Sequence, residues 1–185
     1  PGERMLDLGA GTGDLAFEIL HQCPQARVVA ADFTPEMLAV GRRRAPGDRV
    51  AWVVADAHHL PFPCGTFDGL VSGFLLRNVG DLDAALREQA RLLRPEGRLA
   101  CLDTTPPRPG PLRPLLRFHL RVVIPLLGRC IAGDAEAYNY LPASTEAFQT
   151  AEALARRMAE AGFRSVHFVR RMLGTIALHW GIAPG

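Results

Sequence analysis

The sequence lacks lysine and contains little cysteine, and each scarcity excludes a class of protein. All 21 basic residues of the 185-residue chain are arginines, which we attribute first to genome composition. The four cysteines stand far apart with no CxxC pair, so we expect reduced thiols rather than a disulfide framework or a zinc site. The adjacent His58 and His59 have no cysteine nearby, so we interpret them as partly solvated and expect no bound metal. No stretch approaches the roughly 20 apolar residues of a membrane span.

The chain as a whole also has little net charge. The net charge is +2, with 22% charged and 48% hydrophobic residues. This composition is typical of a folded domain, excludes a disordered chain and gives no reason to expect nucleic-acid binding. The length suits one domain with one core, which we expect to span residues 1–185. Residues 105–133 are an exception, because they hold five arginines and no acidic residue.

The first half of the chain alternates strand-like and helix-like segments. We expect strands over Arg4–Leu8, Arg27–Ala31, Val50–Ala55, Phe67–Gly73 and Arg98–Leu102. Helices are expected over Asp14–Leu20, from a Thr34-Pro35-Glu36 start to about Arg44, and after a cap at Asp81 or Asp83. The tetrapeptide Arg94-Pro95-Glu96-Gly97 predicts a stop and a turn. This alternation predicts a doubly wound, mostly parallel sheet with helices on both faces.

The alternation breaks after residue 104. Residues 105–114 hold five prolines, and residues 112–132 are apolar with arginines spaced by four on one helix face. Two interpretations stay open: a helix that covers the sheet with a solvated basic stripe, or a lid that contacts an anionic membrane surface. A helix from about Thr150 to Gly162 and strands at Val166–Arg170 and Gly174–His179 are expected to follow.

A glycine-rich octapeptide, Asp7-Leu8-Gly9-Ala10-Gly11-Thr12-Gly13-Asp14, follows the first strand and opens the first helix. Glycines let the backbone turn tightly and approach a ligand closely. The spacing is GxGxG rather than the GxGxxG of dinucleotide-binding loops, and the chain contains no GKS or GKT. The flanking acids suit a cationic ligand and would repel a pyrophosphate. The loop therefore argues against NAD and against a P-loop.

Acidic residues also end the next two strands. Asp32 ends the second strand, where a carboxylate in a doubly wound sheet accepts hydrogen bonds from ribose hydroxyls. Asp56, followed by Ala57, ends the third strand and could accept a hydrogen bond from an adenine amino group. Any one of these features alone would more often be a cap or a turn. Together, at the carboxyl ends of successive strands, they predict one adenosine ligand.

These segments resemble the successive motifs of class I S-adenosylmethionine (SAM)-dependent methyltransferases. The resemblance implies SAM as the cofactor and a seven-stranded, Rossmann-like α/β sheet whose last strand is antiparallel. It also implies which residues bind the cofactor: Asp7, Gly9, Gly11, Thr12, Gly13, Asp32, Phe33, Asp56 and Ala57.

Three later segments resemble the ubiquinone/menaquinone biosynthesis C-methyltransferases of the UbiE type. They are Phe74–Val79 with its Arg-Asn pair, Asp134–Leu141 with Tyr-Asn-Tyr-Leu, and Gly174–Gly181. The resemblance implies C-methylation of a polyprenyl hydroquinone, a cytoplasmic location at or near the inner face of the membrane, and catalytic roles for Arg77, Asn78, Tyr138 and His179. Arg77 would hold a developing phenolate, Asn78 a ring oxygen, and His179 or His119 would accept a proton. A structural cap or ion pair at Arg77-Asn78, and a packed tyrosine at 138, remain the alternatives.

The sequence also departs from that family. Leu75 replaces a glycine before the Arg-Asn pair, Gly73 replaces a serine near the cofactor, and Gln149 replaces a proline after the Tyr-Asn-Tyr-Leu segment. The chain begins Pro1-Gly2 without Met, so we expect the family's N-terminal covering helices to be missing and residues 105–149 to form a substrate-covering insertion. A class I methyltransferase for another small lipophilic acceptor, and a non-catalytic SAM-binding domain, stay open as alternatives. So do the choice between a benzoquinol and a naphthoquinol, contact with an anionic membrane, and a homodimer.

Overall fold

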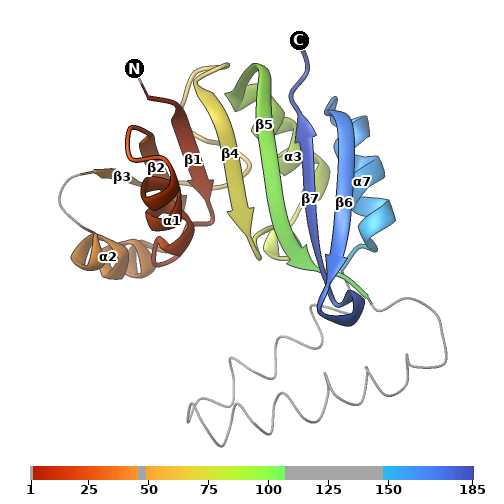
Figure 1. Cartoon of the computed structure of the whole chain (residues 1–185), viewed down its shortest axis with the longest axis horizontal. Helices are drawn as coiled ribbons and strands as arrows, with labels where there is room; N and C mark the ends of the chain where they lie inside the picture. The colour runs from red at the N-terminus through yellow and green to blue at the C-terminus, as the bar shows by residue number, and fades with distance from the viewer. Residues whose placement is uncertain (1, 46–48, 107–147) are drawn as a thin grey trace, which may run out of the picture.

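A seven-stranded sheet forms the centre of the computed structural model, which describes residues 2–45, 49–106 and 148–185 (Figure 1). The strands are β1 (Arg4–Leu8), β2 (Arg27–Asp32), β3 (Val50–Val54), β4 (Phe67–Gly73), β5 (Leu93–Thr104), β6 (Arg164–Arg171) and β7 (Ile176–Ile182). Their order in the sheet is β3-β2-β1-β4-β5-β7-β6. The first five are parallel, and β7 runs antiparallel to both β5 and β6. The predicted sheet, with its antiparallel last strand, is confirmed.

Helices cover both faces of this sheet (Figure 1). They are α1 (Asp14–Gln22), α2 (Pro35–Arg44), α3 (Leu82–Leu92) and α7 (Ala151–Glu160), with short 3-10 turns η1 (Leu76–Asn78) and η3 (Met172–Gly174). Pro35 occupies the first turn of α2, and the Asp81 carboxylate caps α3 by accepting a hydrogen bond from the Ala84 N–H at 2.9 Å. The predicted starts of both helices are confirmed.

The sheet divides the core into two clusters, because its central strands bury side chains on both faces. On one face, α3 and α7 pack Leu86, Leu154 and Met158 onto the sheet, and all three are at most 2% exposed. On the other face, α1 packs Ala16 and Leu20 against β2. Burial of such side chains holds the strands in register and fixes the edge at which β1 to β4 end.

The segment Arg94–Gly97 corrects the predicted turn. β5 begins at Leu93 and runs through this segment rather than starting at Arg98. Leu93 pairs with Phe67, whereas Arg98 pairs with Gly69, so the register with β4 shifts between them. Glu96 takes a left-handed backbone with φ of 66°. The turn residues therefore produce an irregularity inside a strand, because pairing with β4 continues on both sides of them.

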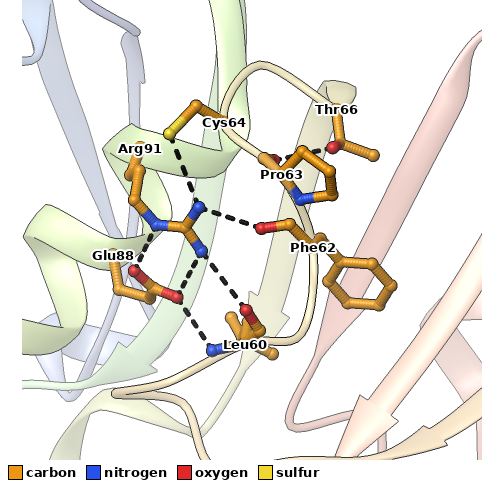
Figure 2. A network of polar contacts seen from close by, with 7 residues as sticks. All are labelled: Leu60, Phe62, Pro63, Cys64, Thr66, Glu88 and Arg91. Carbon is orange, nitrogen blue, oxygen red and sulfur yellow. Dashed lines mark hydrogen bonds and ion pairs between the residues drawn. The ribbon is translucent and has the colours of Figure 1, made fainter.

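A polar network ties the loop that follows β3 to α3 (Figure 2). The Arg91 guanidinium donates hydrogen bonds to the carbonyls of Phe62 at 2.9 Å and Leu60 at 3.3 Å. Glu88 pairs with Arg91 at 2.7 Å and accepts a hydrogen bond from the Leu60 N–H at 2.8 Å. The hydrogen bonds from Arg91 hold the pKa of the Glu88 carboxyl below its usual value. These contacts hold residues 60–62 of the loop between β3 and β4 against α3.

Several predicted features lie outside the described residues. They are Tyr138, His119, Cys130, the basic apolar segment 112–132 and most of the insertion predicted over residues 105–149. Thr105 and Pro106 at one end of that insertion, and Phe148 and Gln149 at the other, are described. Among the described helices, none is both long enough and apolar enough to cross a bilayer.

Candidate functional site

A cavity of about 750 Å³ opens at the carboxyl ends of β1, β2, β3 and β4. The strand order reverses between β1 and β4, and ligands of open α/β sheets bind at such a point. The cavity has the size of a typical small-molecule site. Of the residues predicted for the site, it is lined by Gly9, Gly11, Thr12, Asp32, Phe33, Asp56, Ala57 and Asn78. The structure thus brings together four segments that the sequence places far apart.

The glycine loop takes a backbone that requires glycine. Gly9, Gly11 and Gly13 have φ values of 70°, 54° and 86°, which side chains disfavour. A Cβ on Gly9 would lie 2.9 Å from the Leu75 side chain, and one on Gly13 would lie 2.5 Å from Trp52. Gly13 accordingly faces Trp52, while Gly9 and Gly11 form part of the cavity wall.

Asp32 both shapes the glycine loop and lines the cavity. Its Oδ2 accepts a hydrogen bond from the Gly11 N–H and its Oδ1 accepts one from the Thr34 N–H, each at 2.8 Å. Each carboxylate oxygen has two lone pairs, so these bonds leave acceptor capacity toward the cavity. A ribose diol is the kind of donor pair that this carboxylate suits.

Asp7 lies beneath the glycine loop and has no exposed surface. Its Oδ2 accepts a hydrogen bond from the Ala16 N–H at 2.9 Å, and its Oδ1 has no partner among the described residues. Burial raises the pKa of Asp7 to about 7, and the nearby Asp32 and Asp14 carboxylates add to the effect, against the Ala16 hydrogen bond. The structure places Asp7 behind the loop, where it supports the start of α1, rather than on the cavity wall.

We expect the raised pKa of Asp7 to appear as a pH dependence of stability. Because the folded chain binds this proton more tightly than the unfolded chain, folding stability falls as the pH rises from about 4 toward 7. Between pH 5 and pH 7 the loss should be about 2 kcal/mol. Urea unfolding of Asp7→Asn should lack this loss, whereas Asp14→Asn, which alters an exposed carboxylate of lowered pKa, should keep it. Equal pH profiles for the wild type and Asp7→Asn would contradict the expectation.

A chain of hydrogen bonds crosses the wall beyond β3. The Asp56 Oδ1 accepts hydrogen bonds from the His58 N–H at 2.9 Å and from its Nδ1 at 2.7 Å. The His58 Nε2 in turn accepts a hydrogen bond from the Asp81 N–H at 3.2 Å, so the ring proton belongs on Nδ1. The hydrogen bonds from His58 lower the pKa of Asp56 and keep it an acceptor. His58 lines the cavity, but the sequence analysis did not predict it as a site residue. The available signal was its position two residues after Asp56, where an aspartate side chain commonly accepts a hydrogen bond from the backbone.

Large apolar side chains are exposed around the mouth of the cavity. Phe33 is 74% exposed, Met37 is 43% exposed and Phe74 is 39% exposed, and all three line the cavity. Exposed apolar side chains that cluster around one cavity often mark a binding site, whereas isolated ones are ordinary features of a protein surface. Phe74 also has a φ of 59°, an uncommon backbone for an aromatic residue that often accompanies a functional site.

Arg77 lies beside this cavity, in a buried ion pair. Its guanidinium contacts the Asp103 carboxylate at 2.9 Å, and the side chains are 8% and 1% exposed. The Arg77 N–H also donates to Asp103 at 3.1 Å, and the guanidinium lies 4.9 Å from the Phe74 ring centre. Arg77 lines a second cavity of about 430 Å³, which shares Val79 and Gly80 with the first. Asn78, its neighbour, lines the first cavity.

His179 lies in the core beneath α7 rather than on the wall of either cavity. Its Nε2 donates a hydrogen bond to the Ala151 carbonyl at 2.9 Å, and its ring stacks on Phe168 at 5.3 Å. Burial lowers its pKa, so the ring is neutral. Its surroundings are those of a structural histidine, and the structure does not bring it to the other predicted catalytic residues. Tyr138 lies outside the described residues.

The charges around the first cavity favour a cationic adenosine ligand. The carboxylates of Asp14, Asp32 and Asp56 line it, and none of its described lining residues is an arginine. Arg44 approaches from α2 but pairs with Asp14 at 2.6 Å. A pyrophosphate would meet repulsion here, whereas a sulfonium and an amino group would be attracted. The glycine cradle, the acceptor at Asp32 and the acceptor at Asp56 together fit SAM.

Comparisons with known proteins point the same way. The sequence matches the ubiE/COQ5 methyltransferase family over residues 1–183. It is 46% identical over 179 residues to a ubiquinone/menaquinone biosynthesis C-methyltransferase UbiE from Desulfotalea psychrophila, covering 97% of this chain and 73% of the relative. It is 46% identical over 184 residues to a demethylmenaquinone methyltransferase from Thermus thermophilus, covering 98% and 83%. A solved SAM-dependent methyltransferase from Aquifex aeolicus has a similar fold, with a TM-score of 0.71, 17% identity and coverage of 98% and 82%.

Proposed function

Since the chain belongs to the ubiE/COQ5 methyltransferase family, we propose that its first cavity holds SAM and its second receives the ring of a polyprenyl hydroquinone. The chain is a SAM-dependent methyltransferase that methylates carbon in quinone biosynthesis, and its substrate is a lipophilic quinol. The observation that carries the placement is the meeting of the glycine loop, Asp32 and Asp56 around one cavity.

On this proposal, the residues at the strand ends divide the recognition of SAM between them. Asp32 accepts hydrogen bonds from the ribose hydroxyls while it holds Gly11 and Thr34 in place. Asp56 accepts a hydrogen bond from the adenine amino group, and Phe33 and Met37 cover the apolar faces of the adenosine. SAM supplies an electrophilic methyl group on a sulfonium. The protein fixes its direction, which is the main way in which such a site accelerates a transfer between two bound reactants.

The acceptor side is assigned to the second cavity, where Arg77 and Asn78 stand at the junction with the first. A ring carbon is a poor nucleophile until a neighbouring phenol loses its proton. Arg77 cannot act as the base, because a guanidinium stays protonated in proteins. Since Asp103 already neutralises much of its charge, we assign Arg77 to electrostatic support of the phenolate and to holding η1 against β5. Asn78 is proposed to bind a ring oxygen and Tyr138 to contact the acceptor. Of the two proton acceptors that the sequence suggests, His119 is the candidate that remains, because His179 lies in the core and lines neither cavity.

We further propose a cytoplasmic location at the inner face of the membrane, with residues 105–149 covering the acceptor. A polyprenyl tail resides in the bilayer, so the enzyme must reach a headgroup at the surface. The apolar, arginine-rich sequence of residues 112–132 supports contact with anionic lipid. A homodimer is compatible with this location and is not required by it.

The experiment that tests the function is turnover with labelled SAM. Demethylmenaquinol and a ubiquinone-pathway benzoquinol are offered in anionic and in neutral vesicles, with a soluble phenol and phosphatidylethanolamine as control acceptors. We expect one methyl group on a ring carbon of a quinol, located by NMR, and faster transfer from anionic vesicles. Transfer to the phenol or the phospholipid alone would favour a different lipophilic acceptor. SAM binding without any transfer in a single turnover would favour a non-catalytic SAM-binding domain.

A further inference from the structure

We propose that His58 is a positioning residue that couples the adenine wall of the SAM cavity to the turn that begins α3. One wall of the cavity is formed by Asp56, Ala57 and His58, and another by the Asn78–Gly80 segment. The imidazole of His58 joins them, because it contacts Asp56 on one side and the Asp81 backbone on the other. The inference rests on the proposed function for its effect on the acceptor, whereas the joining of the walls is tested without it.

The geometry gives the two ring nitrogens different tasks. Nδ1 donates to the Asp56 carboxylate at 2.7 Å, and Nε2 accepts from the Asp81 N–H at 3.2 Å. A neutral imidazole is a side chain that donates at one end and accepts at the other along a rigid ring. His58 therefore transmits the position of one partner to the other.

Asp81 is a sensitive place for such a contact. Its carboxylate caps α3 by accepting from the Ala84 N–H, so its backbone position sets the first turn of the helix. The residues directly before it, Val79 and Gly80, line both cavities. A shift at Asp81 would therefore change the wall shared by the SAM cavity and the proposed acceptor cavity.

The far end of the same loop is fastened to α3 independently. Glu88 and Arg91 bind Leu60 and Phe62, as Figure 2 shows. None of these four residues lines the SAM cavity. Loss of the His58 contact would thus leave the loop attached to the helix while releasing the end that borders the cavity. This arrangement separates a positioning effect from general loosening of the fold.

The matched variants are His58→Asn and His58→Gln. An asparagine amide reaches about as far as Nδ1 and can keep the bond to Asp56, while the longer glutamine amide reaches toward the Asp81 N–H. His59→Asn is the control, because the adjacent His59 side chain is exposed and only its backbone N–H bonds to Asp56. The probe is S-adenosylhomocysteine (SAH), which lacks the methyl group and so cannot react.

The first measurement is amide hydrogen exchange at Asp81 by NMR, with and without SAH. We expect SAH to slow this exchange in the wild type and in His59→Asn. In His58→Gln, which keeps a contact to the Asp81 N–H but not the bond to Asp56, the exchange should stay near the wild-type rate and no longer respond to SAH. In His58→Asn the exchange should be about fivefold faster and no longer respond to SAH, as loss of one neutral hydrogen bond predicts. An Asp81 amide that does not respond to SAH in the wild type, that still responds to SAH in His58→Gln, or that exchanges equally fast in His58→Asn and His58→Gln would overturn the proposal.

The second measurement separates the cofactor from the acceptor. For His58→Asn we expect the Kd for SAH to stay within about twofold while the KM for the quinol rises about fivefold. Equal changes in both constants would indicate a merely structural role and would overturn the proposal. Absence of quinol turnover in the wild type would refute the proposed function instead, and the Asp81 exchange would still decide the role of His58.

Discussion

Replacing Asp32 with alanine is expected to weaken SAM binding by at least about 100-fold. The substitution removes the carboxylate oxygens that accept hydrogen bonds from the Gly11 N–H in the glycine loop and from the Thr34 N–H after β2. Both backbone segments border the SAM cavity and lose this support. It also removes the carboxylate that we assign to the ribose hydroxyls, and hydrogen bonds to a charged group are the stronger kind. The two losses act on the same ligand, so their effects on affinity combine.

Calorimetric titration of SAM checks this expectation, with NADH as the control ligand. Asp32→Asn keeps one acceptor oxygen and should fall between the wild type and the alanine variant. Asp14→Asn is the matched control, since Asp14 lines the same cavity but is exposed and already paired with Arg44. If Asp32→Ala bound SAM within about threefold of the wild type, the cavity would not be the adenosine site.

Breaking the ion pair between Arg77 and Asp103 should lower the free energy of unfolding by about 3–5 kcal/mol. Both side chains are buried, so Asp103→Asn leaves the Arg77 charge in a poorly solvated place without a counterion. An exposed pair offers the comparison. Arg157 and Asp83 lie 2.8 Å apart with side chains 36% and 49% exposed, and Asp83→Asn should cost less than about 1 kcal/mol.

Urea unfolding measures these costs, and a double variant separates stability from catalysis. Replacing both partners, Arg77→Met with Asp103→Leu, should restore most of the lost stability, because neither buried charge then remains. Turnover should stay low if Arg77 supports the phenolate. If the double variant is stable and turns over at the wild-type rate, the Arg77–Asp103 pair has only a structural role. Arg77 would then not support the phenolate.

The strands, the helix starts and the class of ligand were predictable because each depends on short-range patterns. Apolar runs bounded by turn residues marked β1 to β4, and Pro35 and Asp81 marked two helices. The glycine loop and the acids that follow β2 and β3 converged because parallel strands end at one edge of a sheet. The turn predicted at Arg94–Gly97 was wrong in part, because pairing with β4 overrides the local preference of Pro-Glu-Gly.

The side-chain partners were harder to predict, because they depend on contacts across the sheet. The sequence placed Arg77 after a strand but carried no sign of Asp103, which lies on the neighbouring β5. His179 matched a motif, yet the pairing of β7 with β5 and β6 turns its ring toward Ala151 and α7. His58 was set aside as solvated, because its partner Asp81 is brought near only by the fold.

The position of β7 between β5 and β6 also dictates an order of assembly. In the described sheet β6 is paired to β7 and not to β5, so β6 joins the sheet only through β7, as a hairpin with it or after it. Thr104 pairs with Ile176, and closing the long chain between them carries an entropic cost before that pairing gains anything. Strands β1, β2 and β3, which are followed by the glycine loop, Asp32 and Asp56, pair in chain order and need no closure of that length. The strands that carry the residues assigned to the methyl donor can therefore pair early in folding, while the half that carries Asp103 and supports the acceptor is completed by β7 and β6.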